Sequence, residues 1–175
     1  MRKRIVLLLT YTFITTITIS MYRVVYNLYL REIGFSNALI GNVTSAQLWG
    51  SAIIGLLTAV LADTIGKKKI LFLSAVVVPV SGIALAFVVD PTFILVLSFI
   101  KGGFTVTAFT VVMATMTSIT KTGNRARVFG LNFGINMASG VIGNFIGGAF
   151  GDLFGLQTTL IISMVAHLPA IIPVI

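Results

Sequence analysis

Long uncharged hydrophobic runs, separated by short polar segments, make up almost the whole chain. A helix that crosses the roughly 30 Å hydrocarbon core of a bilayer needs about 20 mainly apolar residues. The pattern predicts six such helices, at residues 5–30, 37–62, 70–89, 92–117, 127–150 and 156–175. The runs are continuous and do not alternate every second residue, so they do not indicate the strands of an outer-membrane barrel. We therefore expect an all-α membrane protein with six transmembrane helices.

The first segment combines basic residues with an apolar run, as a secretory signal peptide does. No small-x-small cleavage site follows it, and the apolar run continues to about Leu30. We therefore interpret this segment as an uncleaved first transmembrane helix.

Basic residues are distributed unequally between the two ends of the predicted bundle. With six spans, the two termini and the connections 63–69 and 118–127 lie on one side of the membrane. Arg31 is the one basic residue at the end of a span on the other side. Because the loops are short, the positive-inside rule applies and predicts that both termini are cytoplasmic, in a plasma (inner) membrane. The basic residues on the predicted cytoplasmic side are Arg2, Lys3, Arg4, Lys67, Lys68, Lys69, Lys121, Arg125 and Arg127.

Composition supports a membrane protein and excludes several other classes. Hydrophobic residues make up 57% of the chain and charged residues 9%, and the mean hydropathy is +1.09. The net charge of +8 does not indicate a nucleic-acid partner, because the basic residues lie in short loops between apolar spans. Without cysteine and with a single histidine, we expect no metal site, no cofactor and no enzyme activity.

A short motif occurs twice, at the ends of the second and fifth predicted helices. Ala62-Asp63-x-x-Gly66 matches Gly151-Asp152-x-x-Gly155, 89 residues later. A repeat displaced by three helices reverses its direction through the membrane. The sequence therefore predicts a 3+3 inverted repeat, with units at about 1–89 and 90–175 of a single domain, as in secondary transporters.

The segment 61–69, LADTIGKKK, resembles the signature loop G-x-L-A-D-R-x-G-R-R between helices 2 and 3 of the major facilitator superfamily. Two positions depart from that pattern, since Ala59 replaces the first glycine and Thr64 the arginine. The segments 27–36, NLYLREIGFS, and 125–131, RARVFGL, are similar to the family's helix 1 exit and helix 5 start. The resemblance covers nearly the whole chain.

This resemblance implies the N-terminal six-helix half of a transporter with a rocker-type alternating-access mechanism. It also implies that Asp63, Gly66, Lys67 and Lys68 form a loop involved in conformational switching. Family transporters place the substrate between two such halves, so we expect a second half as partner. The chain could be a fragment, a half that dimerises, or one subunit of a split pair.

Two positively charged residues fall within predicted spans. Inserting each of them at the centre of a membrane helix costs about 3 kcal/mol on insertion scales. Lys101 lies near the middle of the fourth span. Arg23 shares a helix face with Asn27, although snorkelling to the interface would also explain Arg23. The asparagines of the fifth span either line a substrate cavity or form hydrogen bonds to neighbouring helices. Our candidate cavity-lining residues are Arg23, Asn27, Gln47, Lys101, Asn132 and Asn136.

The expected function is secondary active transport of a small solute. The alternative is a non-transporting membrane scaffold or assembly protein. No acidic residue lies inside a predicted span, and we expect His167 to be a packed, neutral residue. Small residues at Ser139, Gly143 and Gly147 predict close helix contact, as do Ser51, Gly55 and Ala59.

Overall fold

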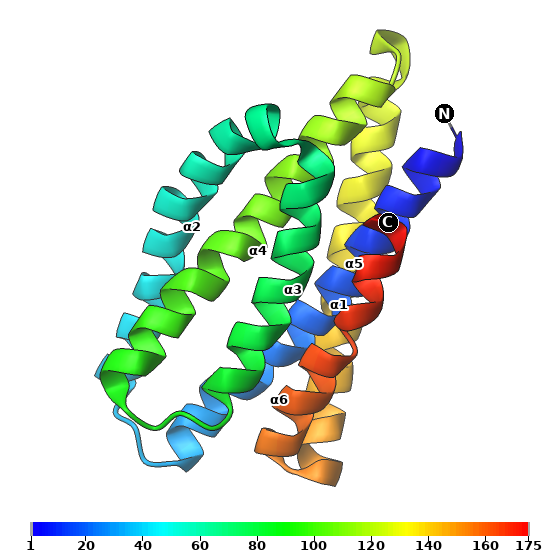
Figure 1. Cartoon of the computed structure of the whole chain (residues 1–175). Helices are drawn as coiled ribbons and strands as arrows, with labels where there is room; N and C mark the ends of the chain where they lie inside the picture. Colours follow the sequence, from blue (N-terminus) through cyan, green and yellow to red (C-terminus); the bar gives the residue numbers. More distant parts are fainter. Residues whose placement is uncertain (1, 175) are drawn as a thin grey trace.

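The computed structural model describes residues 2–174, apart from the side chains of Arg2, Ala59 and Val174. The chain is helical, with short connections (Figure 1). Its elements are α1 (Arg2–Glu32), α2 (Asn37–Ile65), α3 (Lys67–Leu85), α4 (Pro91–Ile119), η1 (Thr122–Asn124), α5 (Arg125–Phe154), α6 (Leu156–Val165) and η2 (Leu168–Val174). Six segments are long and apolar enough to cross a membrane, the last one running through α6 and η2. The predicted fold class is confirmed.

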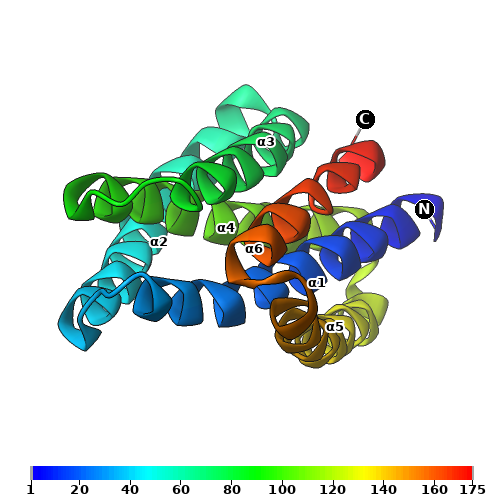
Figure 2. The ribbon, with the colours of Figure 1, turned by 90° about the horizontal axis from the view of Figure 1, so that it is seen from below.

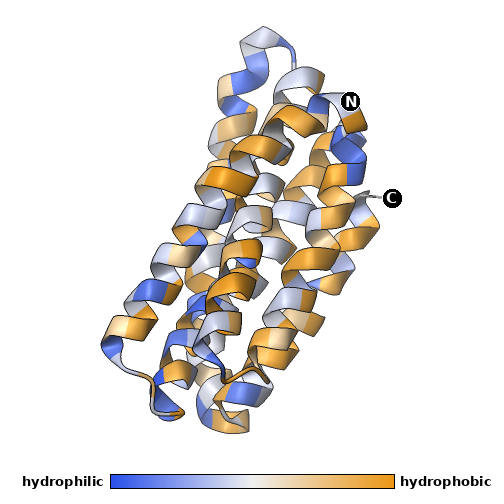
Figure 3. Ribbon diagram, turned by 60° about the vertical axis from the view of Figure 1, so that its left-hand side comes forward, coloured by the Kyte–Doolittle hydropathy of each residue, from blue (hydrophilic) through white to orange (hydrophobic). Residues whose placement is uncertain are grey.

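Both chain ends lie toward one end of the bundle, together with the α2–α3 and α4–α5 connections (Figure 1). Hydrophobic positions follow every helix, and hydrophilic ones occur at the helix ends and connections and at some positions within the bundle (Figure 3). This distribution matches a bundle whose sides face lipid and whose two ends face water.

Local sequence signals explain where several helices start. The Ser36 hydroxyl accepts a hydrogen bond from Leu39 N at 3.3 Å and so caps α2. The Asp90 carboxylate accepts hydrogen bonds from Thr92 N and Phe93 N at 2.9 and 3.1 Å, ahead of Pro91 at the first position of α4. These groups satisfy amides that have no partner inside the helix.

Two helix pairs form the centre of the packing. The most extensive contacts join α2 to α4 and α1 to α5, while α3 covers α4 and α6 covers α1. A view from below shows α3 and α6 on one side of the bundle and α5 on the other (Figure 2). Among the spanning segments, α5 and α2 are the least covered by other helices. In the most apolar stretch of each, 17% and 24% of the residues are buried, against 50% for α3. These two helices therefore leave the most surface for lipid or a partner.

Glycines allow the closest helix contacts. A Cβ on Gly143 would lie 2.3 Å from the carbonyl oxygen of Ile17 in α1. A Cβ on Gly102 of α4 would likewise lie 2.3 Å from the carbonyl oxygen of Gln47 in α2. The predicted close contact of α5 through Gly143 and Gly147 is therefore confirmed. On the α2–α4 side, the closest contacts are made by Gly50, Gly102 and Gly103.

Two predicted boundaries were wrong. The last span is not one continuous α-helix, because α6 ends at Val165 and η2 begins at Leu168. Pro169 lacks an amide hydrogen, and its ring would clash with the carbonyl of Val165 in a regular helix. The lysines placed in a 63–69 loop instead form the first turn of α3, which begins at Lys67 directly after Gly66.

The two copies of the repeated motif have the same backbone conformation. Gly66 has φ 105° and ψ 131°, and Gly155 has φ 81° and ψ 156°. Each glycine N–H donates to a carbonyl four residues earlier, Ala62 O at 3.2 Å and Gly151 O at 3.0 Å. A positive φ of this kind strongly favours glycine, so both motifs make the same helix-to-helix turn.

Replacing Gly66 with alanine should lower the free energy of unfolding by about 1–3 kcal/mol, because the backbone at this position is strained for a residue with a Cβ. Thermal unfolding of the purified chain in detergent measures the effect. Gly41→Ala is the control, since Gly41 lies within α2 and a Cβ there meets no atom within 4 Å. Equal stability of the two variants would contradict this account of the turn.

Candidate functional site

A cavity of 480 Å³ lies between α1, α3, α4 and α5. Its volume is within the range of about 300–1,000 Å³ that is typical of ligand pockets. Hydroxyl and amide groups line it, including those of Thr12, Thr15, Thr16, Asn136 and Asn144. Tyr11 also borders the cavity, and its hydroxyl is buried without a hydrogen-bond partner among the described residues. The cavity thus offers polar groups that a bound solute or water could engage.

A second cavity of 260 Å³ adjoins the first, between α1, α2 and α4. Ile19, Arg23 and Thr105 line both cavities. Together the two cavities are bordered mainly by α1, α2, α4 and α5.

Lys101 is the most deeply buried cation at this site, with 5% of its surface exposed. Its Nζ lies 3.9 Å from the centroid of the Tyr22 ring. The ring is held in place because the Tyr22 hydroxyl donates to Gly82 O at 3.1 Å and because Tyr22 stacks on Tyr26 at 5.2 Å between centroids. Lys101 borders the smaller cavity, and the cation–π contact with Tyr22 offsets part of the desolvation of its ammonium.

Three further candidates border the same cavity as Lys101. Arg23 and Asn27 lie one helical turn apart on α1 and are exposed, whereas Gln47 of α2 is half-buried. Arg23 makes no ion pair or hydrogen bond with another residue in the range 2–174. Four candidates from three helices are therefore brought together around one cavity.

The structure separates the two candidate asparagines of α5. Asn136 lines the larger cavity and donates from Nδ2 to Thr16 Oγ1 at 3.0 Å. Asn132 is 1% exposed and accepts a hydrogen bond from Thr12 Oγ1 at 2.9 Å. Asn132 borders neither cavity, and it bonds α5 to α1 within the helix interface.

His167 also belongs to the lining of the larger cavity, which the sequence did not indicate. It is 1% exposed, and its Nδ1 lies 2.8 Å from Thr18 Oγ1. The turn between α6 and η2 positions this side chain against α1. Threonines at positions 12, 15 and 16 were a signal that sequence analysis missed, since their spacing of three and four residues places them on one helix face.

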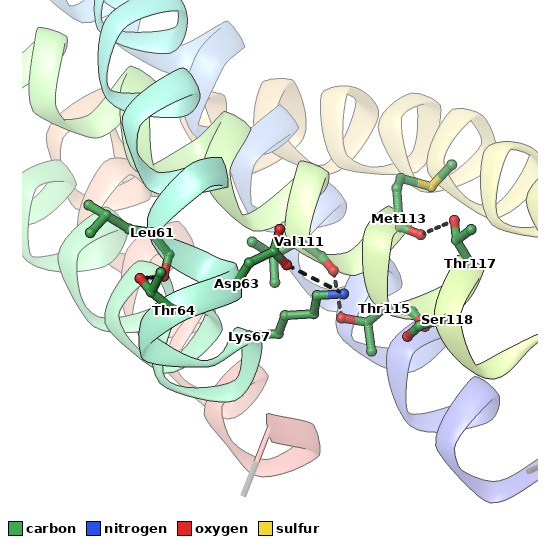
Figure 4. A network of polar contacts seen from close by, with 9 residues as sticks. All are labelled: Leu61, Asp63, Thr64, Lys67, Val111, Met113, Thr115, Thr117 and Ser118. Carbon is green, nitrogen blue, oxygen red and sulfur yellow. Dashed lines mark hydrogen bonds and ion pairs between the residues drawn. The ribbon is translucent and has the colours of Figure 1, made fainter.

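The predicted switch residues lie where α2 meets α3. Asp63 and Lys67 point toward each other across Gly66, with 4.0 Å between Oδ1 and Nζ (Figure 4). Asp63 is largely exposed, so this ion pair contributes at most about 1 kcal/mol. Lys68 follows in the first turn of α3 and is exposed. The segment thus combines a constrained glycine with a weak ion pair.

Comparison with known proteins identifies the family. Residues 8–175 match the family model described as Major Facilitator Superfamily. No curated protein matches the chain. Members of this superfamily are multi-pass membrane transporters of small-molecule substrates, not enzymes. Because the match covers nearly the whole chain, the chain belongs to the Major Facilitator Superfamily.

Proposed function

We propose that the chain forms one six-helix half of a secondary active transporter for a small solute. The observation that carries this proposal is the pair of adjoining cavities between α1, α2, α4 and α5, whose linings include polar side chains and the intramembrane cations Arg23 and Lys101. Charged residues at membrane depth are costly and commonly mark solute pathways. We assign binding roles to Arg23, Asn27, Gln47, Lys101 and Asn136, and an interface role to Asn132.

Transport proceeds by rocking of this half against a second half, which opens the cavities to each side in turn. The second half packs on the side of α2 and α5, the least covered helices. The segments 1–89 and 90–175 act as inverted repeats, as the matching turns at Gly66 and Gly155 support. Both termini lie in the cytoplasm. The connection formed by Asp63, Gly66, Lys67 and Lys68 changes conformation when the two halves rock.

Cysteine labelling tests this mechanism, because the natural chain contains no cysteine. Thr105→Cys places a thiol at a position shared by both cavities. A membrane-impermeant maleimide should label it from both faces of the membrane, in right-side-out and in inside-out vesicles. Val80→Cys is the matched control, since Val80 is 59% exposed on the outer face of α3 and lines neither cavity.

If the chain is part of a transporter, the maleimide should label Thr105→Cys and should not label Val80→Cys. Lipid excludes the reagent from the thiol at position 80. A scaffold without alternating access would leave Thr105→Cys unlabelled, or would label it from one face alone. Labelling after denaturation shows that each thiol is intact. Absence of labelling in both vesicle types would therefore contradict the proposed function.

Native mass spectrometry of the chain in nanodiscs identifies the source of the second half. A dimer is expected if a second copy covers α2 and α5. A monomer that gains mass when a separate six-helix partner is added indicates a split pair or a longer parent chain. A monomer that labels from both faces on its own would contradict the need for a second half.

A further inference from the structure

We propose that the transported solute is an anion with a carboxylate or phosphate group, which binds between Arg23 and Lys101. This inference rests on the proposed function and adds the substrate class to it. Both cations line the same 260 Å³ cavity, and the lining contains no Asp or Glu.

The charges of the whole chain support an anionic solute. Its four acidic residues lie near helix ends or between helices, and none of them borders either of the two cavities. An ion pair joins Lys67 to Asp63, far along the chain from both cavity cations. The positive charge of the site is therefore not neutralised by the protein itself, and a bound anion would supply the missing negative charge. The acidic residues are Glu32, Asp63, Asp90 and Asp152.

The surroundings of Lys101 favour an oxygen ligand. An ammonium has three hydrogens to donate. Its Nζ lies over the face of the Tyr22 ring, which stabilises the charge in part but accepts no conventional hydrogen bond. Lys101 is buried and borders the cavity. Carboxylate or phosphate oxygens in the cavity would accept the hydrogens that remain.

Arg23 provides the second contact and sets the orientation of the solute. A guanidinium can bind a carboxylate or phosphate through two parallel hydrogen bonds. Arg23 borders both cavities, so an anionic group at Arg23 and Lys101 occupies the smaller cavity while the rest of the solute extends into the larger one. The amides of Asn27 and Gln47 are further donors at the anionic end. Tyr11 and Thr15 border the larger cavity, where the rest of the solute would lie.

Thermal unfolding and calorimetric titration of the full chain in detergent test the proposal. The probes are sodium succinate for carboxylates, sodium phosphate for phosphates, and succinamide as a neutral analogue, with ionic strength held constant by sodium chloride. We expect succinate or phosphate to raise Tm in a saturable way, because a ligand of the folded state stabilises it. The probe that acts distinguishes the two anion types. Succinamide should have no comparable effect.

Substitutions connect this binding to the two cations. Arg23→Gln and Lys101→Gln should each weaken binding by about tenfold or more, as expected for loss of a hydrogen bond between charged groups. Arg31→Gln should bind as the natural chain does, since Arg31 lies at the end of the same helix and lines neither cavity. The calorimetric signal separates weaker binding from a change in folding.

Three results would overturn the anionic substrate class: no stabilisation by either anion, equal stabilisation by succinamide, or unchanged anion binding in the Arg23→Gln/Lys101→Gln double variant. Labelling of Thr105→Cys from both faces does not depend on the solute. If that labelling occurs and anion binding fails, the transporter proposal stands and the substrate class alone is wrong. If the labelling itself fails, the proposed function is wrong.

Discussion

Gly143→Ala is expected to lower the free energy of unfolding by about 2–3 kcal/mol, the upper part of the range for an overpacked interior. The added Cβ would lie 2.3 Å from Ile17 O and 3.0 Å from Ile17 Cα. These are backbone atoms of α1, so no side-chain rotation relieves the clash and the two helices must move apart. Thermal unfolding in detergent, with the yield of monodisperse protein as a second measure, gives the loss.

Gly148→Ala is the matched control on the same helix. A Cβ on Gly148 meets no atom within 4 Å, and alanine is a better helix former than glycine by about 1 kcal/mol. The control should therefore be as stable as the natural chain or slightly more so. If Gly143→Ala were as stable as Gly148→Ala, the close α1–α5 contact would not exist in the folded protein.

The six spans were predictable because each is a continuous apolar run bounded by polar or turn-forming residues. The predicted ends of the second and fourth helices, 37–62 and 92–117, differ by at most three residues from α2 and α4. The break before η2 was missed because hydropathy measures how apolar a segment is and does not register backbone geometry. Pro169 was the available signal, since proline interrupts the hydrogen bonds of an α-helix.

Site residues were harder to predict because periodicity identifies a helix face and not its neighbours. Successive residues four apart on a helix drift by about 40° around its axis. This small rotation is enough to turn Asn132 into the interface with Thr12, while Asn136 reaches the cavity beside Thr16. His167 could not be placed from sequence, because its position depends on the turn after α6.

Intramembrane cations were the most informative sequence signal. Arg23 and Lys101 lie 78 residues apart in the sequence, and their helices bring both to one cavity. A lone cation in an apolar run is costly wherever the helix packs, so the sequence predicts a functional role without showing the residue's partner. The contact between Lys101 and Tyr22 required the structure, since it depends on how α1 and α4 cross.

Lys101→Met is expected to stabilise the ligand-free protein and to abolish anion binding. Methionine is close to lysine in length and is apolar, so it fills the same space at a position that is 5% exposed. A charged lysine at the centre of a membrane helix is disfavoured by about 3 kcal/mol relative to an apolar residue. Part of this gain is lost with the cation–π contact to Tyr22, although a sulfur–aromatic contact replaces some of it. We expect a net gain of about 1–2 kcal/mol.

Opposite changes in stability and binding distinguish a binding residue from a structural one. If Lys101 served mainly to hold α4 against α1 through Tyr22, its removal would lower Tm along with anion binding. If it serves to bind an anion, Tm without ligand rises and the stabilisation by succinate or phosphate disappears. Tyr22→Phe is the matched variant, since it keeps the ring beneath Nζ and removes only the hydroxyl that donates to Gly82 O. It should retain anion binding, because the ammonium and the ring face beneath it remain. Loss of binding in this variant would instead assign the effect to the packing of α1 against α3.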